Sequence, residues 1–526
     1  MNNQQTLHSQ QIHSQEPMPM QMGRRMSRRE RWRQRIMGTP NQRPLTLRQD
    51  RTIPKWLIGQ AVVFFFIAFV ACTFVFGNAM EFSLAIISSL SVLLFFYLGQ
   101  AKSEDWVLKN ERTFIRNVFV LGLLIRLAWS MYCYFFFNPE YYGTAFGDAA
   151  DVEWYMPFAQ DLAQWIQGDS PMSLSQIIDN NSAAIDDVGY PMWLAIGYAI
   201  WGDWSDVFIP FLVKCLAGAY CAVCIYRVTS RHFGEGAARM AAIFVALNPN
   251  MIYWCGNMFK ETEMVFLCCL CVELVDRTFT SGSRLTFKSL LPGVLAGMAV
   301  FFFRAPLAIV LFMAMFAHVV MASSRVMSLG KKIIAGVMVA IVLLVGMGDR
   351  LRTQTESLVE EAQSDTQQRN MEWRSKSEGG NEFAKYAGKT VFAPLIFTIP
   401  FPTFNIANEG QILQRQLSGG NYIKNILSFF VILVMFIMLL RGDWRKHVFI
   451  LAYTLGYLMT LVLSNFAQSS RFHMPIWPML MLFAAYGIQL AKSNSQYRSW
   501  FTVALVVEVV ACLAWNWFKL KGRGMI

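Results

Sequence analysis

Three carboxylates lie close together in the segment FGDAADVEWYMPF, which begins at Phe146. Asp148 and Asp151 are three residues apart, and Glu153 follows within a helical turn. A carboxylate at a membrane surface can take a proton from a hydroxyl, and neighbouring aromatic rings raise its pKa toward a useful value by desolvation. Two such acids can instead bind a divalent cation, Mg²⁺ or Mn²⁺. A third interpretation is ordinary solvated loop acids, and the residue types leave all three open.

Lys260 opens a hydrophobic stretch in the segment NMFKETEMVF. A lysine at a helix N-terminus forms a cationic site for phosphate, because the free backbone N–H groups add to its charge. The alternative is a lysine that reaches toward water and pairs with Glu261 or Glu263.

Two arginines and a histidine are expected at the same level of the membrane. Arg304 stands in FFFRAPL between two apolar runs, while Arg471 and His473 stand in SSRFHMP at the outer end of another. Together with Lys260 they suit an anionic leaving group next to a base. His473 alone is equally typical of a structural histidine. Arg126, in the middle of an apolar run, is expected to pair inside the bundle with an acid such as Glu263 or Glu273.

The acidic segment needs an element that holds it at the membrane surface. From Asp151 onward, apolar side chains recur every three or four residues, at Trp154/Tyr155, Phe158, Leu162 and Trp165/Ile166. This pattern predicts an amphipathic helix in the interface, which would hold Asp148 and Asp151 between water and lipid. Glu153, Tyr155 and Glu261 are expected to support this loop or to contact an acceptor.

The composition predicts an integral membrane protein. Of 526 residues, 55% are hydrophobic and only 15% are charged, far from a typical soluble domain. Apolar runs of roughly 20 residues repeat along the chain, so we expect an all-α polytopic fold. The net charge of +12 is concentrated at the N-terminus and in short loops, which reports topology and needs no nucleic-acid partner.

Thirteen hydrophobic spans are predicted, at 54–77, 82–98, 115–137, 206–226, 237–254, 259–275, 289–303, 305–322, 332–347, 421–440, 447–464, 473–491 and 499–517. Basic residues fill the loops expected inside, and the basic block Arg24 to Arg35 places the N-terminus in the cytoplasm. In this register the segment 138–190 is external and acidic. Residues 189–202 are too short to span and predict a juxtamembrane or re-entrant helix.

The predicted organisation has four parts. Residues 1–53 form a disordered basic cytoplasmic tail. Residues 54–347 form an N-terminal transmembrane module that includes the external acidic loop 138–205. Residues 348–420 form an external loop with an amphipathic or re-entrant part, and 421–526 the C-terminal transmembrane helices.

The order of these segments resembles a family. The acidic loop, then GYPMWLAIGYAIWG, then YRVTSRHFGEGAAR before a helix ending in ALNPN, and late SSRFHMPIWPMLMLFAAYGI, are similar to bacterial GT-C membrane glycosyltransferases related to protein mannosyltransferases and aminoarabinose transferases. The resemblance spans about residues 54 to 491. It implies a GT-C-like bundle in the bacterial plasma membrane, a polyprenyl-phosphate sugar donor, inverting transfer on the outer face, and a catalytic aspartate that maps to Asp148, with Asp151 second.

The sequence therefore predicts an enzyme that moves a sugar from a polyprenyl phosphate to a hydroxyl of a glycan, lipid or protein. Asp148 is the expected base; Lys260, Arg304, Arg471 and His473 are the expected phosphate ligands. The chain departs from many relatives by a Lys260-Glu261 pair where they have Thr-Asp, which leaves the acceptor open. Two other interpretations are a polymerase or ligase that uses a diphosphate-linked glycan, and a transporter of lipid-linked oligosaccharide.

Overall fold

The chain is an all-α polytopic membrane protein, as the hydropathy pattern predicts. The computed structural model describes residues 45–70, 82–147, 149–181, 183, 185–202, 208–280, 287–321, 418–463 and 471–522, with 330, 333, 336 and 337 as isolated positions. All regular structure in these ranges is helical. Four of the described helical segments are long and apolar enough to cross a membrane: Glu111–Glu140, Ile209–Phe233, Tyr422–Arg441 and Met474–Ser493.

The N-terminal half contains the helices α2 (Leu47–Arg51), α3 (Lys55–Val70), α4 (Phe82–Asp105), α5 (Glu111–Tyr132), η2 (Cys133–Phe137), α6 (Asn138–Tyr142), α7 (Ala149–Gln167), α8 (Leu174–Asn180), η3 (Ile185–Asp187), α9 (Gly189–Trp201), α10 (Ile209–Phe233), α11 (Glu235–Leu247), α12 (Pro249–Tyr253) and η4 (Trp254–Gly256). The remaining helices are α13 (Glu261–Thr280), α14 (Phe287–Phe303), α15 (Ala305–Met321), α22 (Ser418–Arg441), η7 (Asp443–His447), α23 (Val448–Leu463), η9 (Met474–Ile476), α24 (Trp477–Ser493) and α25 (Ser495–Gly522).

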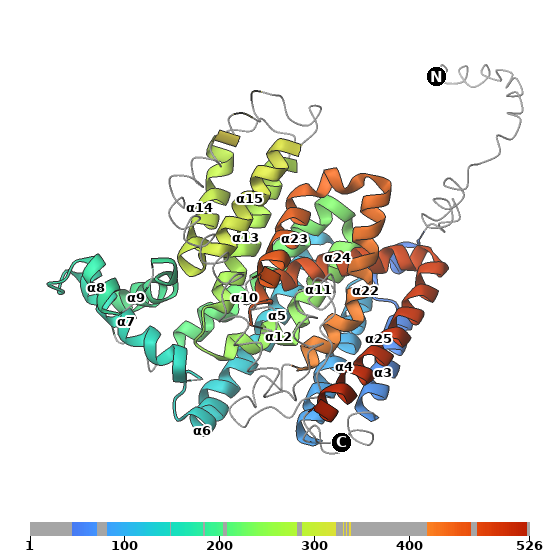
Figure 1. Cartoon of the computed structure of the whole chain (residues 1–526), viewed down its shortest axis with the longest axis horizontal. Helices are drawn as coiled ribbons and strands as arrows, with labels where there is room; N and C mark the ends of the chain where they lie inside the picture. The colour runs from blue at the N-terminus through green and yellow to red at the C-terminus, as the bar shows by residue number, and fades with distance from the viewer. Residues whose placement is uncertain are drawn as a thin grey trace, which may run out of the picture. The chain divides into compact units, whose positions relative to one another are not determined.

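Helices α10, α11, α13 and α24 form the centre of the bundle. Helix α10 packs against α5, α11 and α13, and α11 packs in turn against α24. The alanine-rich sequence of α11 is buried from Gly236 to Leu247, which lets its neighbours approach closely on every side. Helices α22 and α24 pack together, and so do α15 and α23, so late segments complete a core begun early in the chain (Figure 1).

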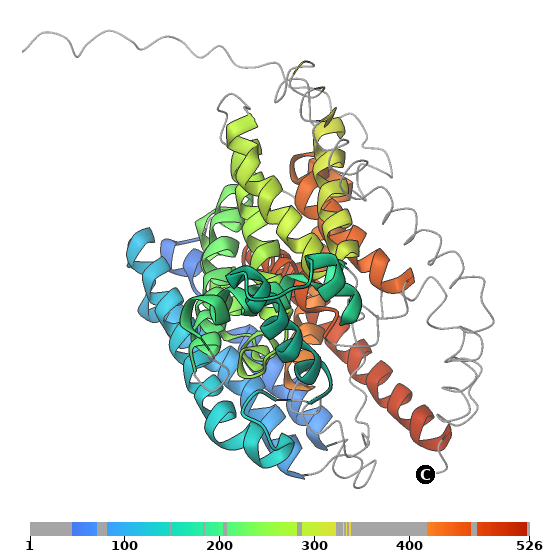
Figure 2. The same cartoon turned by 90° about the vertical axis from the view of Figure 1, so that its left-hand side faces the viewer.

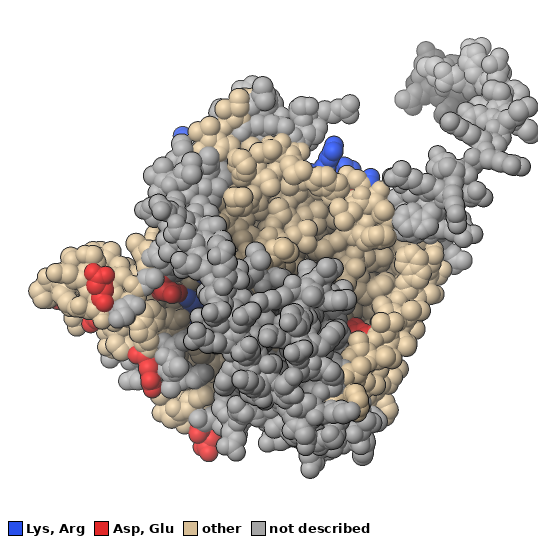
Figure 3. Space-filling view, viewed as in Figure 1, with Lys and Arg blue, Asp and Glu red and all other residues tan. Residues whose placement is uncertain are grey.

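Helices α7, α8 and α9 form a layer on one side of the bundle (Figures 1 and 2). Helix α7 packs on α9, and α9 reaches α14, where Gly189 lies so close that an added Cβ would stand 2.7 Å from the Phe302 backbone. Glu140, Glu153, Asp169 and Asp179, in this layer and in the preceding α6, are exposed. Figure 3 shows acidic side chains over the same part of the surface. The external side assigned to them remains a prediction.

Several predicted elements differ from the observed ones. The predicted span 237–254 is two helices, because Asn248 takes an extended conformation before Pro249 and its side chain accepts a hydrogen bond from the Met251 amide. Residues 45–53, assigned to the tail, include α2, whose Arg51 pairs with Glu235. Most of the predicted span 332–347 and of the external loop 348–420 lies outside the described residues, and the last three positions of that loop, 418–420, belong to α22.

The predicted apolar face of α7 packs on protein over most of its length. Tyr155, Phe158 and Leu162 are buried, but Trp165 and Ile166 are 38% and 41% exposed. The buried face of α7 is set by its packing on α9, and the last turn of α7 extends beyond that contact. Helix α9 itself is 13 residues long, too short to span a membrane, as predicted.

Candidate active site

The chain between η4 and α13 carries the first predicted cation. Asn257 has extended backbone after η4, and Lys260 then stands directly before the first turn of α13. The Lys260 ammonium forms an ion pair with Asp187 of η3. The local pairing of Lys260 with Glu261 or Glu263, considered from the sequence, is therefore wrong, because each of those acids faces a different cation.

Arg471 binds the acid that follows Lys260. Its guanidinium Nε donates a hydrogen bond to the Oε1 atom of Glu261, a side chain with no exposed surface. The guanidinium also lies 4.7 Å from the centre of the Phe259 ring and 5.8 Å from that of Trp254. These aromatic faces favour a cation here and hold the planar guanidinium in place.

Phe472 brings the third predicted cation to the same place. The guanidinium of Arg304, which follows the end of α14, lies 4.3 Å from the centre of the Phe472 ring. The Tyr457 hydroxyl donates a hydrogen bond of 2.8 Å to the Phe472 carbonyl and so fixes this residue against α23. The tripeptide Arg471–Phe472–His473 thus lies against α13, the α14–α15 junction and α23 at once.

His473 contacts a lysine that sequence reasoning missed. Its Nδ1 atom lies 2.9 Å from the Nζ atom of Lys424 in the second turn of α22. Lys424 is 2% exposed, and its ammonium also lies 5.7 Å from the centre of the Trp477 ring. A single lysine in the apolar run NYIKNILSFF was the available signal, because ionisable residues within membrane segments are functional suspects by default.

Lys214 is a second buried lysine that the sequence analysis did not consider. It stands in α10, has no exposed surface, and pairs with Glu263 at 2.9 Å. It also donates to the Phe259 carbonyl and lies 5.1 Å from the centre of the Tyr190 ring. These contacts tie α10, α13 and α9 together, so Lys214 supports the chain segment that carries Lys260.

The predicted acids are described only in part. Asp148 and the side chain of Asp151 lie outside the described residues, although Asp151 itself belongs to α7. The preceding residues are well placed: the Met258 amide donates a hydrogen bond of 2.9 Å to the Phe146 carbonyl. Gly147 has a φ of 103°, and an added Cβ would stand 2.3 Å from Asn257 Oδ1. The acidic segment therefore enters α7 beside the chain that leads into Lys260.

The other two residues expected near the acids have different environments. Glu153 is exposed on α7. Tyr155 is 4% exposed, and its ring lies edge-on to that of Tyr190, with 5.0 Å between their centres. Tyr155 thus packs the base of the acidic segment against α9, while Glu153 faces away from this contact.

Side chains of α5 and of the first residue of α6 donate hydrogen bonds to backbone carbonyls of the segment before Lys260. Trp129 donates to the Tyr253 carbonyl at 3.1 Å, Ser130 to Cys255 at 2.8 Å and Asn138 to Gly256 at 2.9 Å. Arg126 donates in the same way to the carbonyls of residues 245 and 246. Its structural role is as predicted, but the proposed acidic partner is wrong, because Glu263 and Glu273 pair with Lys214 and Arg231 instead.

The tripeptide 471–473 therefore has an excess of positive charge around it. Arg471 belongs to it, Arg304 and Lys424 contact its other two residues, and among the described residues Glu261 is the carboxylate that pairs with Arg471. Two buried indole N–H groups next to these cations, those of Trp254 and Trp477, have no hydrogen-bond partner. Cations and free donors together suit an anion with several oxygen atoms, such as a phosphate group.

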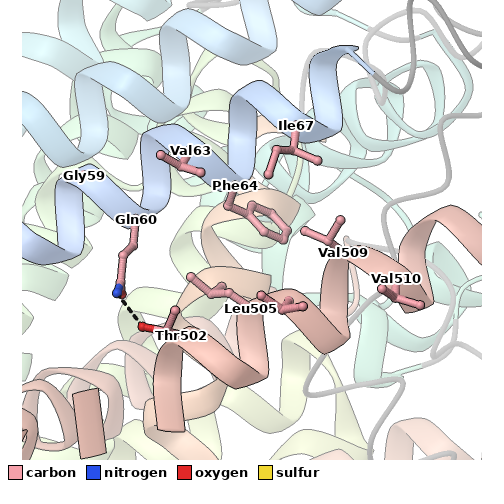
Figure 4. Close-up of a pocket in the computed structure, with 10 residues that line it drawn as sticks. Gly59, Gln60, Val63, Phe64, Ile67, Thr502, Leu505, Val509 and Val510 are labelled. Carbon is pink, nitrogen blue, oxygen red and sulfur yellow. Dashed lines mark hydrogen bonds between the residues drawn. The ribbon is translucent and has the colours of Figure 1, made fainter. Parts of the chain in front are cut away.

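A separate groove lies between α3 and α25 and has a volume of about 300 Å³ (Figure 4). It is lined by Val63, Phe64, Ile67 and Leu505 among others, and its two polar side chains, Gln60 and Thr502, hydrogen-bond to each other at 2.7 Å. Its lining thus suits hydrocarbon, and none of the predicted site residues contributes to it.

In the described ranges no group of three or more His, Cys, Asp or Glu side chains could hold a metal ion, and the predicted Mg²⁺ or Mn²⁺ site at Asp148 and Asp151 stays a prediction.

One family model matches the chain, that of dolichyl-phosphate-mannose-protein mannosyltransferase, over residues 189–347. Over these residues the chain is similar to that family, which supports the predicted GT-C glycosyltransferase-like membrane protein. The matched part is under a third of the 526 residues and contains Lys214, Lys260, Glu261 and Arg304, while Arg471 and Lys424 lie beyond it. No curated protein and no solved structure matches the chain.

Proposed function

We propose that the protein transfers a sugar from a polyprenyl phosphate to a hydroxyl group of a glycan, lipid or protein at the outer membrane face. The observation that supports this most is the gathering of Arg304, Arg471 and Lys260 around the start of α13, next to the chain that enters the acidic segment. The three cations are far apart in sequence, and Arg304 has no carboxylate partner among the described residues that would account for its place there.

The chemistry assigned to Asp148 is general base catalysis. Its carboxylate takes the proton of the acceptor hydroxyl while the oxygen attacks the anomeric carbon of the sugar. The bond from that carbon to the phosphate oxygen breaks on the opposite face, so the configuration inverts. The carrier phosphate leaves with the electron pair, and Arg304, Arg471 and Lys260 stabilise its charge.

The test is sugar transfer by the purified full-length protein in detergent, with polyprenyl-phosphate sugars as donors. Asp148→Asn should lower the transfer rate about 10²- to 10⁴-fold, because it removes the base and keeps the size of the side chain. Asp169→Asn, at an exposed acid of the same segment, should leave the rate unchanged. Wild-type turnover by Asp148→Asn removes the assignment of the base.

The same assay separates the other interpretations. A transporter gives no transfer in detergent, where no compartments exist. A polymerase or ligase of diphosphate-linked glycans uses the diphosphate donor in preference to the monophosphate. Turnover with the monophosphate donor, inhibited by free polyprenyl monophosphate, is the result that the proposed function expects.

A further inference from the structure

Lys424 is buried beside the candidate site, and none of the described carboxylates balances its charge. It is 2% exposed, and no carboxylate pairs with it in the described parts of the chain. Its polar contact is the Nδ1 atom of His473 at 2.9 Å, and its other neighbour is the face of Trp477. A buried ammonium is costly unless an anion or several acceptors compensate it.

Other polar groups at this end of α22 are also unsatisfied. Asn425, the next residue, has no exposed surface and leaves both amide atoms without a hydrogen-bond partner. Asn250 lies in α12, a helix that packs on α22. It is also fully buried, and neither of its amide atoms has a hydrogen-bond partner among the described residues. The Trp477 indole N–H beside Lys424 is a further buried donor without a partner. Since native proteins pair nearly all buried polar groups, so many exceptions at one place indicate a missing polar ligand.

We infer that Lys424, positioned by His473, is a phosphate-binding residue for the lipid carrier and acts together with Arg304. This inference rests on the proposed function. Arg304 contacts the Phe472 ring and Lys424 contacts the His473 ring, so the two cations approach neighbouring residues of one loop from α14 and α22. Neither has a carboxylate partner among the described residues, in contrast to Lys260, Lys214 and Arg471. A phosphate group would supply the missing negative charge and the acceptors.

A ligand-binding lysine and a structural lysine differ in what their removal does. If Lys424 serves the fold, Lys424→Met lowers the melting temperature of the ligand-free protein. If it serves phosphate, the substitution removes an uncompensated buried charge, and the melting temperature of the ligand-free protein stays the same or rises. The affinity for the carrier falls at the same time.

The experiment measures binding of polyprenyl monophosphate and of polyprenol, which lacks the phosphate, to purified full-length protein. Lys424→Met should weaken binding of the phosphate about 10-fold or more, and binding of polyprenol should not change. Lys446→Met, at an exposed lysine of η7, is the matched control and should bind as the wild type does. Lys424→Gln serves as a second variant if Lys424→Met does not fold.

The outcomes separate this inference from the proposed function. A wild-type protein that does not bind polyprenyl monophosphate contradicts the proposed function itself. If the wild type binds polyprenyl monophosphate and the Lys424 variants bind it with the same affinity, only the role of Lys424 is overturned. If the Lys424 variants lose affinity for polyprenyl monophosphate and for polyprenol equally, the role of Lys424 is also overturned, because the lysine would then act on the shape of the site.

Discussion

At the residue scale, the contact between Arg471 and Glu261 shows how a charge can serve both the fold and a ligand. Glu261 has no exposed surface, so its carboxylate depends on Arg471 for compensation, while its second oxygen has no hydrogen-bond partner. The Arg471 side chain is 24% exposed, so it is not sealed off from a second anion. Arg471 can therefore hold Glu261 and still contact a departing phosphate.

The substitution Arg471→Met should have two separable effects. It leaves a buried carboxylate unpaired, which should cost about 3 to 5 kcal/mol of stability. It should also raise the KM for the donor. Adding Glu261→Gln removes the stranded charge, so the double variant should regain most of the stability and keep the raised KM. Thermal unfolding and donor titration measure the two effects.

A double variant with wild-type KM would show that Arg471 serves the fold alone. The sequence could identify Arg304, Arg471 and Lys260 as cations at the ends of apolar runs. It could not identify their partners, because Arg471 and Glu261 are 210 positions apart and the helices that bring them together pack in an order that hydropathy does not encode. Lys424 was missed for the same reason, since its neighbour His473 is 49 positions away, in the turn before η9.

At the scale of elements, the entry into α7 depends on a backbone conformation. Gly147 has a φ of 103°, which L side chains rarely adopt, and it lies against Asn257. The sequence predicted this helix from Asp151 onward, because apolar side chains recur every three or four residues there, and the helix begins two residues earlier, at Ala149. It did not predict the break at Asn248. The long apolar run 237–254 predicted one span, although a proline disfavours a helical conformation in the residue before it. The exposed last turn of α7 was not predicted either.

Gly147→Ala should lower both stability and transfer. The backbone conformation costs about 1 to 3 kcal/mol for a residue with a side chain, and the new Cβ would clash with Asn257 Oδ1 at 2.3 Å. The matched control is Gly143→Ala, where φ is 71° but no atom lies within 4 Å of the added Cβ. Melting temperatures and transfer rates of the two variants isolate the effect of the clash.

Equal losses in the two variants would mean that backbone conformation alone matters at Gly147. Adding Asn257→Ala to Gly147→Ala should recover part of the lost stability, because it removes the atoms that the Cβ would meet. No recovery in that double variant would contradict the close approach of these two segments.

At the scale of the whole molecule, the candidate site and a second charged cluster lie toward opposite ends of α13. Near its C-terminal end, Asp276 accepts hydrogen bonds of 2.6 Å from Arg231 and from His232, and His232 contacts His447 at 2.7 Å. Fifteen residues of helix separate Asp276 from Glu261, which is roughly 22 Å. This cluster ties α10, α13 and η7 together and contains none of the predicted site residues.

Asp276→Ala should therefore destabilise the protein without changing the site. Its loss leaves Arg231 and His232 without their shared carboxylate, and we expect a loss of about 3 to 5 kcal/mol because Asp276 is buried. The KM for the donor should stay at the wild-type value below the melting temperature. A raised KM without a change in melting temperature would contradict this division of the molecule into a site and a stabilising end.

The hydropathy pattern predicted the class of fold and most helix positions, because a membrane requires long apolar helices whatever their packing. The order in which those helices pack, and hence the convergence of cations on residues 471–473, needed the structure. Asp148 lies outside the described residues, so the base remains a prediction of the sequence and of the resemblance that it carries.

The most direct measurement is an experimental structure of the purified protein with bound polyprenyl monophosphate. The phosphate group should lie within about 4 Å of at least two of Arg304, Arg471 and Lys424, on the side of the bundle where Phe146 meets Met258. Two results would contradict the assignment of this site. One is a phosphate at the Arg231–Asp276 end of α13. The other is a phosphate on the lipid-facing surface, with Arg304, Arg471 and Lys424 still in the contacts that they make without it.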